Sequence, residues 1–301
     1  MFDSFSKHLI EVADFLCGYP LFFLLIGGGI YMFVASGAVS LRRLPASVAE
    51  LRRLARDLFM NGRLFIVPTP VGNLGDMTPR AVDVLKSVSL ILAEDTRTSK
   101  PLLTHFGINT PTMSHHKFNE HDSSASIIGR LTNGEDIALI SDAGTPGVSD
   151  PGFYLSRECR RKGIEVITLP GATAFVPALI DSGLPCDRFV FLGFLPVKKG
   201  RATTLELIGS AEMTTIIYES PLRLGKTLSQ LAEACGHDRQ ASVSREISKH
   251  FETTVRGSIA EIMEYFDANP PKGEIVIVIG PKESNEKKVH KNKYKPAPAE
   301  V

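Results

Sequence analysis

The sequence predicts an α/β protein built around parallel strands, and three observations support that prediction. Downstream of Arg63, short apolar runs alternate with stretches that have the periodicity of amphipathic helices. Several apolar runs end in loops rich in glycine, proline and aspartate, as buried strands of open α/β sheets do at their carboxyl ends. The chain has 301 residues, of which 43% are hydrophobic and 22% charged, enough for about two globular domains.

The first 59 residues do not follow that pattern. No charged residue lies between Phe15 and Leu41, a stretch long enough to cross a bilayer, and the arginines after it would place its C-terminal side in the cytoplasm. The run FLCGYPLFFLLIGGGIYMFVASGAVSLRRLP resembles the first hydrophobic segment of sodium–alanine symporters. Because Met60 directly precedes a clean domain start, we favour a gene-prediction or fusion artefact over a true membrane anchor or a helix folded onto the globular part.

A first α/β domain is predicted over residues 60–183. It opens with a strand at Leu64–Val67, which runs into a Gly/Pro loop at 68–76. Thr78 can cap the helix that follows, because a threonine side chain accepts hydrogen bonds from the first free N–H groups of a helix. A short strand at Leu90–Ala93 comes next, and then a helix, a strand and a helix precede the central strand.

The loop after the central strand is the one around which we expect the chain to be organised. The strand is predicted at Ile137–Ile140, and the sequence from Leu139 to Gly152 is LISDAGTPGVSDPG. Two prolines, three glycines and two aspartates in one loop are more than a plain turn needs, and such loops on rigid scaffolds carry function. A helix over 153–162, a strand over 165–169 and a third loop, PGATA at 170–174, follow.

A second domain is predicted over residues 184–282, after a linker at Leu184–Asp187. Its expected strands lie at 189–193, 214–218, 241–247, 253–255 and 274–279, with helices ending near 234 and spanning 259–266. Residues 283–301 form a Lys-rich tail that we expect to be disordered, because it has little apolar content.

Composition and motifs exclude several classes of function. With a net charge of +1, the protein as a whole is not basic enough to attract nucleic acid, so RNA binding would need a local basic patch. The sequence contains no G-x-G-x-x-G, P-loop, H-E-x-x-H or G-x-S-x-G motif. His115, His116 and His121 lack the other ligands that would complete a metal site, so we expect a solvated loop there and no metal. The four cysteines form no C-x-x-C pair, which favours reduced thiols.

Six segments together identify a family. They read LFIVPTPVGNLGDMTPRAVDVLKSVSLILAEDTR, SHHKFNEHD, ISDAGTPGVSDPG, LPGATAF, FVFLGFLP and IIYESPLRL. From about Arg63 to Pro281 the chain resembles the bacterial 2′-O-methyltransferases of small-subunit ribosomal RNA, in the tetrapyrrole-methylase group of S-adenosylmethionine enzymes. The resemblance implies a class III methyltransferase fold, with two α/β domains and the cofactor S-adenosylmethionine in the cleft between them.

The resemblance also implies a reaction and a partner. It implies 2′-O-methylation of the ribose of cytidine 1402 in 16S rRNA, within the small ribosomal subunit, by a cytoplasmic homodimer. A membrane is implied only if residues 15–41 are genuinely translated. A porphyrinoid or diphthine-type methylase of the same fold, and a membrane-associated binding protein without catalysis, stay open as alternatives. The loops at 69–76 and 142–147 favour the ribosomal branch, because tetrapyrrole enzymes typically carry G-x-G-P-G-D-P and G-D-P-x-x-F-G there.

Cofactor-binding residues are expected on all three loops and on one strand of the second domain. Loop N–H groups suit the cofactor's carboxylate, and Asp142 or Asp150 suits its ammonium group or ribose hydroxyls. The resemblance places an adenine contact at the end of the strand predicted at 214–218. The full predicted set is Pro70, Asp142, Gly144, Thr145, Val148, Asp150, Thr173, Ala174, Tyr218 and Glu219.

Catalytic and RNA-binding candidates lie on other connections. A ribose hydroxyl is a weak acid, so a methyl transfer to it benefits from a base, for which we consider Glu94, Lys117 and Glu120. The segment 94–97 can equally be an ion-paired helix cap. The candidates for holding rRNA phosphates are Arg97, Lys198, Lys199, Arg201 and Arg223.

Overall fold

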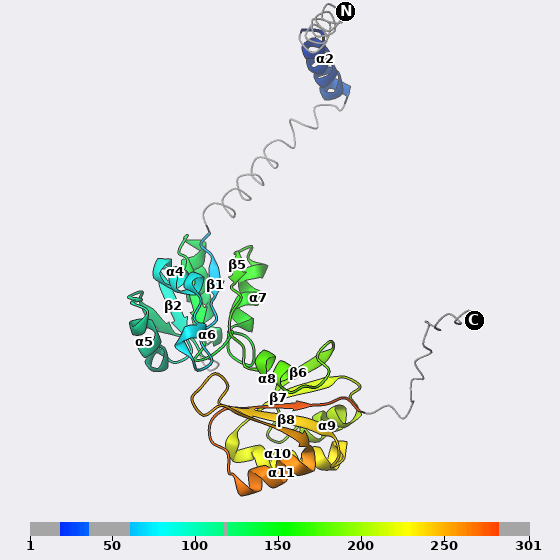
Figure 1. Ribbon diagram of the computed structural model, residues 1–301. Helices are drawn as coiled ribbons and strands as arrows, with labels where there is room; N and C mark the ends of the chain where they lie inside the picture. The colour runs from blue at the N-terminus through cyan, green and yellow to red at the C-terminus, as the bar shows by residue number, and fades with distance from the viewer. Residues whose placement is uncertain (1–18, 36–60, 117–119, 283–301) are drawn as a thin grey trace, which may run out of the picture. The chain divides into compact units, whose positions relative to one another are not determined.

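The computed structural model describes residues 19–35, 61–116 and 120–282 (Figure 1). The chain divides into two compact units, Met1–Asn61 and Gly62–Val301. The predicted tail at 283–301 and Lys117 lie outside the described residues, as does most of the predicted N-terminal extension.

In the first unit the described part is one helix, α2 (Tyr19–Ala35), whose sequence is apolar throughout. Large apolar side chains such as Leu25, Ile30 and Val34 are exposed along it. Within the described residues, no helix combines the length and the apolar character needed to cross a bilayer. The remainder of the apolar stretch predicted at 15–41 lies outside the described residues.

The second unit begins with a five-stranded sheet in which all neighbouring strands are parallel, in the order β3-β2-β4-β1-β5. Its strands are β1 (Leu64–Ile66), β2 (Leu90–Ala93), β3 (Thr112–Ser114), β4 (Ile137–Ile140) and β5 (Val166–Thr168). Its helices are α4 (Pro79–Ser87), α5 (Thr96–His105), α6 (Glu120–Thr132) and α7 (Phe153–Arg161). The predicted βαβ alternation and the predicted β2 and β4 are confirmed; β1 and β5 are shorter than predicted.

Helices cover both faces of this sheet because successive strand residues point to opposite sides. Phe65, Ile91 and Ala138 pack with α4 and α5 in one cluster. Their sequence neighbours, such as Leu64 and Leu139, pack with α6 and α7 in the other. The start of α4 is set as predicted, since the Thr78 hydroxyl accepts from the Ala81 N–H at 3.1 Å.

The strand order places a topological switch between β1 and β4. From β1 the chain crosses to β2 and β3 on one side, and from β4 it crosses to β5 on the other. The loops that follow β1 and β4 therefore open a crevice at the carboxyl edge of the sheet. They are joined there by two backbone hydrogen bonds, from Thr69 N to Gly144 O at 2.9 Å and from Gly144 N to Thr69 O at 3.0 Å.

The second sheet of this unit is mixed, in the order β6-β7-β10-β8-β9. Only β6 and β7 run parallel to each other; β10 is antiparallel to both β7 and β8, and β9 is antiparallel to β8. The strands are β6 (Phe189–Phe194), β7 (Thr214–Glu219), β8 (Gln240–Arg245), β9 (Thr253–Ser258) and β10 (Ile275–Ile279). The antiparallel pairing sets Ile275, the first residue of β10, opposite Glu219, the last residue of β7.

The two faces of this sheet are covered by helices from different parts of the sequence (Figure 1). One face carries α9 (Arg201–Ser210), α10 (Leu224–Cys235) and α11 (Ile259–Ala268). The other carries α8 (Phe175–Asp181), whose Ala178 and Leu179 pack with Ile216 and Val278. Helix α8 lies within the predicted first domain, but it packs on the second sheet. Helix α9 was not predicted; the basic run at 198–201 leads directly into it.

Candidate active site

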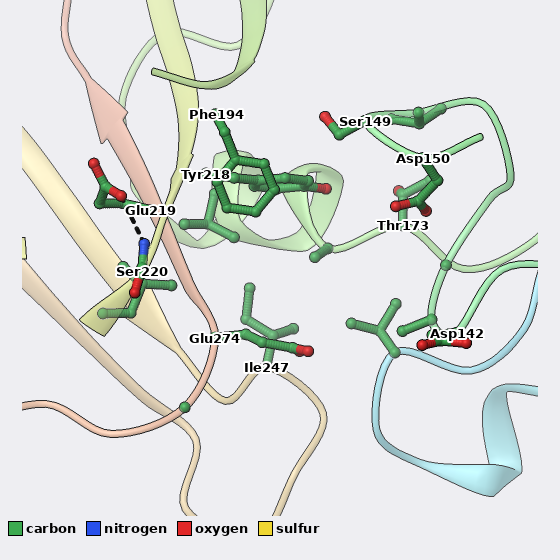
Figure 2. Close-up of a pocket in the computed structure, with 18 of the residues that line it drawn as sticks. Asp142, Ser149, Asp150, Thr173, Phe194, Tyr218, Glu219, Ser220, Ile247 and Glu274 are labelled. Atoms are coloured by element: carbon green, nitrogen blue, oxygen red, sulfur yellow. Dashed lines mark hydrogen bonds between the residues drawn. The ribbon is translucent and has the colours of Figure 1, made fainter. Parts of the chain in front are cut away.

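A cavity of about 390 Å³ lies at the crevice and is lined by both halves of the second unit (Figure 2). Nine of the ten predicted cofactor-binding residues line it: Asp142, Gly144, Thr145, Val148, Asp150, Thr173, Ala174, Tyr218 and Glu219. The exception is Pro70, which is buried, while its neighbour Val71 lines the cavity. A volume of this size suits a small organic molecule.

The three Gly/Pro loops converge as predicted. In addition to the Thr69–Gly144 pairing, the Thr145 hydroxyl donates to the carbonyl of Ala172 in the third loop at 3.0 Å. The central loop turns sharply, with left-handed backbone at Gly144 (φ 82°) and Gly147 (φ 84°), which glycine adopts without a steric penalty. This geometry brings the carboxylates of Asp142 and Asp150 to one wall of the cavity.

That wall is acidic. Burial, and after it the negative charge of Glu94, raises the pKa of Asp150 to about 7. Burial also raises the pKa of Asp142, although a hydrogen bond from the Asp95 N–H to Asp142 Oδ1, at 3.2 Å, opposes the shift. Glu274 points across the cavity toward Asp142 (Figure 2). Asp142 and Glu274 are exposed and Asp150 is half-buried. Carboxylates that face one another across a cavity favour a cationic ligand.

The opposite wall is apolar and aromatic apart from Glu274. Tyr218 lies edge-on to Phe194, with ring centroids 5.5 Å apart, and burial raises the pKa of its hydroxyl to about 12. Ile247 and Val276 complete this side. The cavity therefore offers an apolar surface for a flat ring at one end and negative charge at the other.

Glu219, which lines the cavity, is the centre of a buried network. Its side chain is 0% exposed, and its Oε1 accepts from Ser220 N and pairs with Arg223, both at 2.7 Å. Its Oε2 accepts from the Thr227 hydroxyl at 2.7 Å and lies 4.0 Å from Arg201. Both carboxylate oxygens have partners within the protein, so Glu219 shapes the turn at Ser220 that borders the cavity.

The prediction that Arg201 binds RNA phosphates is wrong. Arg201 is buried, and its guanidinium donates to Gln230, Thr227 and the carbonyl of Pro196 at 2.8–3.2 Å. Arg223 is half-buried in its ion pair with Glu219. Lys198 and Lys199 are exposed, so they remain the accessible part of the predicted basic run.

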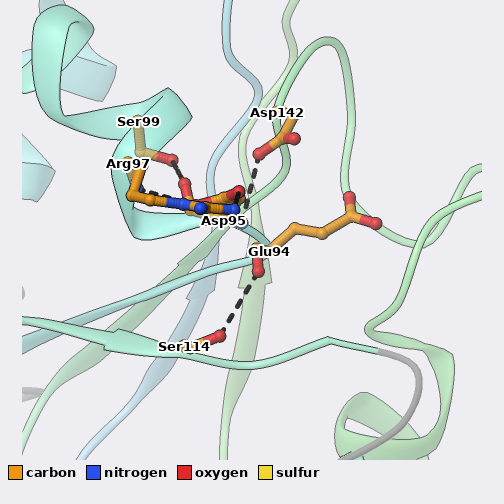
Figure 3. A network of polar contacts seen from close by, with 6 residues as sticks. All are labelled: Glu94, Asp95, Arg97, Ser99, Ser114 and Asp142. Atoms are coloured by element: carbon orange, nitrogen blue, oxygen red, sulfur yellow. Dashed lines mark hydrogen bonds and ion pairs between the residues drawn. The ribbon is translucent and has the colours of Figure 1, made fainter.

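Two of the three candidate bases are described, and their surroundings differ. Glu120 Oε1 accepts from Gly152 N at 3.1 Å, at the start of α7, which is a structural role. Glu94 is half-buried, and its side chain extends away from the neighbouring Asp95–Arg97 pair (Figure 3). Burial and the nearby Asp142 raise the pKa of Glu94, whereas His116 lowers it.

The ion-paired cap considered for residues 94–97 exists, but Glu94 is not part of it. Asp95 accepts from the Arg97 N–H at 2.8 Å and pairs with its guanidinium at 2.7 Å, which sets the start of α5. Arg97 remains highly exposed, at 88% of its side chain, although it is paired with Asp95. Asp95 and Arg97 therefore form the cap, and Glu94 is available for another role.

The expectation of a solvated histidine loop is wrong for His115. This residue is fully buried, and its Nδ1 lies 2.9 Å from the Ser123 hydroxyl. The His115 backbone N–H donates to the carbonyl of Ala93, which ties the segment to β2. The described residues contain no cluster of three or more potential metal ligands.

Sequence reasoning missed the residues that reach the cavity from the second sheet. Gly273, Glu274 and Ile275 lie at the start of β10, and Ile247 lies in the β8–β9 connection. Sites in α/β proteins are expected at the carboxyl ends of strands, whereas Glu274 and Ile275 lie at the beginning of one. Antiparallel pairing brings the beginning of β10 to the end of β7. The Pro-Pro-Lys-Gly-Glu run before β10 was the available signal.

Comparisons with known proteins agree with this geometry. A family model described as Tetrapyrrole (Corrin/Porphyrin) Methylases matches residues 63–263. The Ribosomal RNA small subunit methyltransferase I of Synechocystis sp. is 50% identical over 219 residues, which cover 72% of this chain and 78% of that protein. The protein of the same name from Pseudomonas aeruginosa is 47% identical over 221 residues, with the same coverage of 72% and 78%.

The fold is also found in a solved structure of much lower sequence identity. Uroporphyrin-III C-methyltransferase from Thermus thermophilus, complexed with S-adenyl homocysteine, aligns with a TM-score of 0.51 and 18% identity. The alignment covers 72% of this chain and 97% of that one, and at this identity it shows the fold alone. From the family match and the close relatives, the chain belongs to the tetrapyrrole methylase family.

Proposed function

We propose that the protein is an S-adenosylmethionine-dependent methyltransferase that methylates the ribose 2′-hydroxyl of a cytidine in small-subunit ribosomal RNA. The observation that carries the proposal is the cavity, where three convergent loops set an acidic wall opposite an aromatic one. The close relatives named as small-subunit ribosomal RNA methyltransferases support the choice of substrate. Cytidine 1402 of 16S rRNA is the proposed target, and a homodimer acting in the cytoplasm is the proposed form.

The residues of the cavity fit the cofactor. S-adenosylmethionine, when bound, supplies an activated methyl group carried on a sulfonium. Asp142 and Asp150 would hold its cationic end. Tyr218 and Phe194 offer the apolar surface that an adenine ring requires.

Glu94 is the proposed base. It follows β2, the strand next to β4, so it lies at the same edge of the sheet as the loop after β4. Burial, and after it the negative charge of Asp142, raises its pKa, which increases its strength as a proton acceptor. Glu94 would accept the ribose hydroxyl proton, and Lys198, Lys199 and Arg97 would hold the RNA backbone nearby.

Methyl transfer from tritiated S-adenosylmethionine to small ribosomal subunits tests this function. The subunits are purified from a strain that lacks the modification, and the labelled nucleotide is identified after digestion. Label on the ribose of one cytidine is the expected result. Label on a porphyrinoid or a protein acceptor, with none on the RNA, would reject the proposed substrate and support the alternative methylases of this fold.

The affinity for S-adenosylmethionine is expected to rise with pH between roughly pH 6 and pH 8, by at most tenfold per unit. Asp150, with a pKa of about 7, must lose its proton to hold a cation, so protonation competes with binding below that value. Isothermal titration calorimetry across this range measures the trend. The Asp150→Asn variant serves as the control, because it lacks only this titrating carboxylate; an equal slope in both proteins would contradict the role of Asp150.

A further inference from the structure

The β8–β9 connection, residues 246–252, forms a strap against the cavity. Its Ile247 is buried and lines the cavity wall, between two non-glycine residues in left-handed conformation, Glu246 (φ 52°) and Ser248 (φ 67°). Such backbone is unfavourable and persists where the surroundings impose it, often at ligand sites. The strap is therefore held in place by contacts beyond its own backbone.

Some of those contacts reach the first sheet's loops. The Ser248 hydroxyl donates to Asp76 Oδ2 at 2.7 Å, across 172 residues of sequence. The aliphatic stem of Lys249 crosses Gly72 so closely that a Cβ at that position would collide with Lys249 Cγ. Glycine at position 72 thus makes room for the lysine, and the strap joins the loop after β1 to the second sheet.

The other contacts hold the carboxylate of Glu274. Lys249 Nζ donates to Glu274 Oε2 at 3.1 Å and to Glu246 Oε1 at 3.0 Å. Glu246 also accepts from the Glu274 N–H at 3.1 Å, and its own N–H donates to the Glu274 carbonyl at 3.0 Å. Gly273 allows this approach, because a Cβ there would overlap the Glu246 carboxylate. Glu274 in turn lines the cavity opposite Asp142.

We propose that Lys249 is a positioning residue, which fixes the Glu274 carboxylate at the cavity wall so that it meets the cationic part of the cofactor. Neither residue was expected from the sequence, and the proposal rests on the proposed function for the identity of the ligand. Lys249 has no place on the cavity wall itself and acts through Glu274. The close approach to Gly72 and the Ser248–Asp76 hydrogen bond hold the aliphatic part of the Lys249 side chain in position. They fix it relative to the loops on the other side of the cavity.

The test is calorimetric titration of S-adenosylmethionine into the full-length protein and three variants: Lys249→Met, Glu274→Gln and the double variant. Each single change is expected to weaken binding about tenfold, as expected for one charge-assisted hydrogen bond. The double variant should bind no more weakly than Glu274→Gln alone, because the lysine acts only through that carboxylate. Lys249→Arg should retain most of the affinity.

Two comparisons separate positioning from other effects. Lys272→Met removes an exposed positive charge next to Gly273 and should not weaken binding, since loss of positive charge alone favours a cationic ligand. Gly72→Ala should weaken binding in the wild type but not in Lys249→Ala, where the colliding stem is absent. Unchanged affinity in Lys249→Met, or additive losses in the double variant, would overturn the inference about Lys249 but leave the proposed function intact. A wild-type protein that binds no S-adenosylmethionine would reject the proposed function and the inference with it.

Discussion

Glu94→Gln is expected to lower kcat for RNA methylation by about 100-fold, as removal of a general base does, with little change in the affinity for S-adenosylmethionine. The substitution keeps the size of the side chain and removes its ability to accept a proton. Glu94 is half-buried beside Asp142, does not take part in the Asp95–Arg97 cap, and does not line the cavity. Single-turnover methylation and cofactor titration on the same preparation measure the two quantities separately.

Glu120→Gln is the matched comparison for that experiment. Its amide oxygen can still accept the hydrogen bond from Gly152, so the loop before α7 should stay in place and turnover should be nearly unchanged. Wild-type turnover in Glu94→Gln together with a large loss in Glu120→Gln would transfer the role of the base to Glu120. A loss of cofactor affinity in Glu94→Gln that matches the loss of kcat would instead make Glu94 a binding residue.

Glu219→Ala is expected to lower the free energy of unfolding by about 3–5 kcal/mol, the cost of breaking a buried ion pair by removing one partner. Glu219 is fully buried, and the change leaves buried Arg201 with a reduced set of partners and Arg223 without its carboxylate. The Ser220 N–H and the Thr227 hydroxyl lose an acceptor as well. Denaturant unfolding monitored by circular dichroism measures the change.

Two variants bracket this effect. Glu212→Ala removes an exposed carboxylate just before β7 and should change stability by no more than about 0.5 kcal/mol. Glu219→Gln keeps an acceptor for Ser220 while it removes the charge, so its effect should fall between the other two. Stability of Glu219→Ala close to that of Glu212→Ala would show that the network contributes little to the free energy of unfolding.

Much of the first half could be predicted from sequence because its structure follows from local patterns. Apolar runs such as Ile137–Ile140 form strands buried on both faces, and Thr78 caps α4 through a contact three residues away. The loop from Asp142 to Gly152 was recognised by its turn residues, and the rule that parallel strands present their carboxyl ends at one edge brought it to the cavity. Nine of ten predicted cofactor-binding residues therefore line one site.

What the sequence could not determine depends on contacts between distant segments. The burial of Arg201 and the pairing of Glu219 depend on the packing of α9 and α10 against β7. His115 is buried although its sequence neighbours are polar, with its ring beside Ser123 of α6 and its N–H bonded to Ala93 of β2.

The amino-acid sequence by itself determined the family, the parallel sheet and the three loops, because each is encoded in neighbouring residues. Only the tertiary structure decided which side chains complete the cavity, since antiparallel β10 brings Glu274 to the end of β7 and the strap brings Lys249 to Gly72. Charge and burial at such a junction arise from residues far apart in the chain, and no local pattern encodes them.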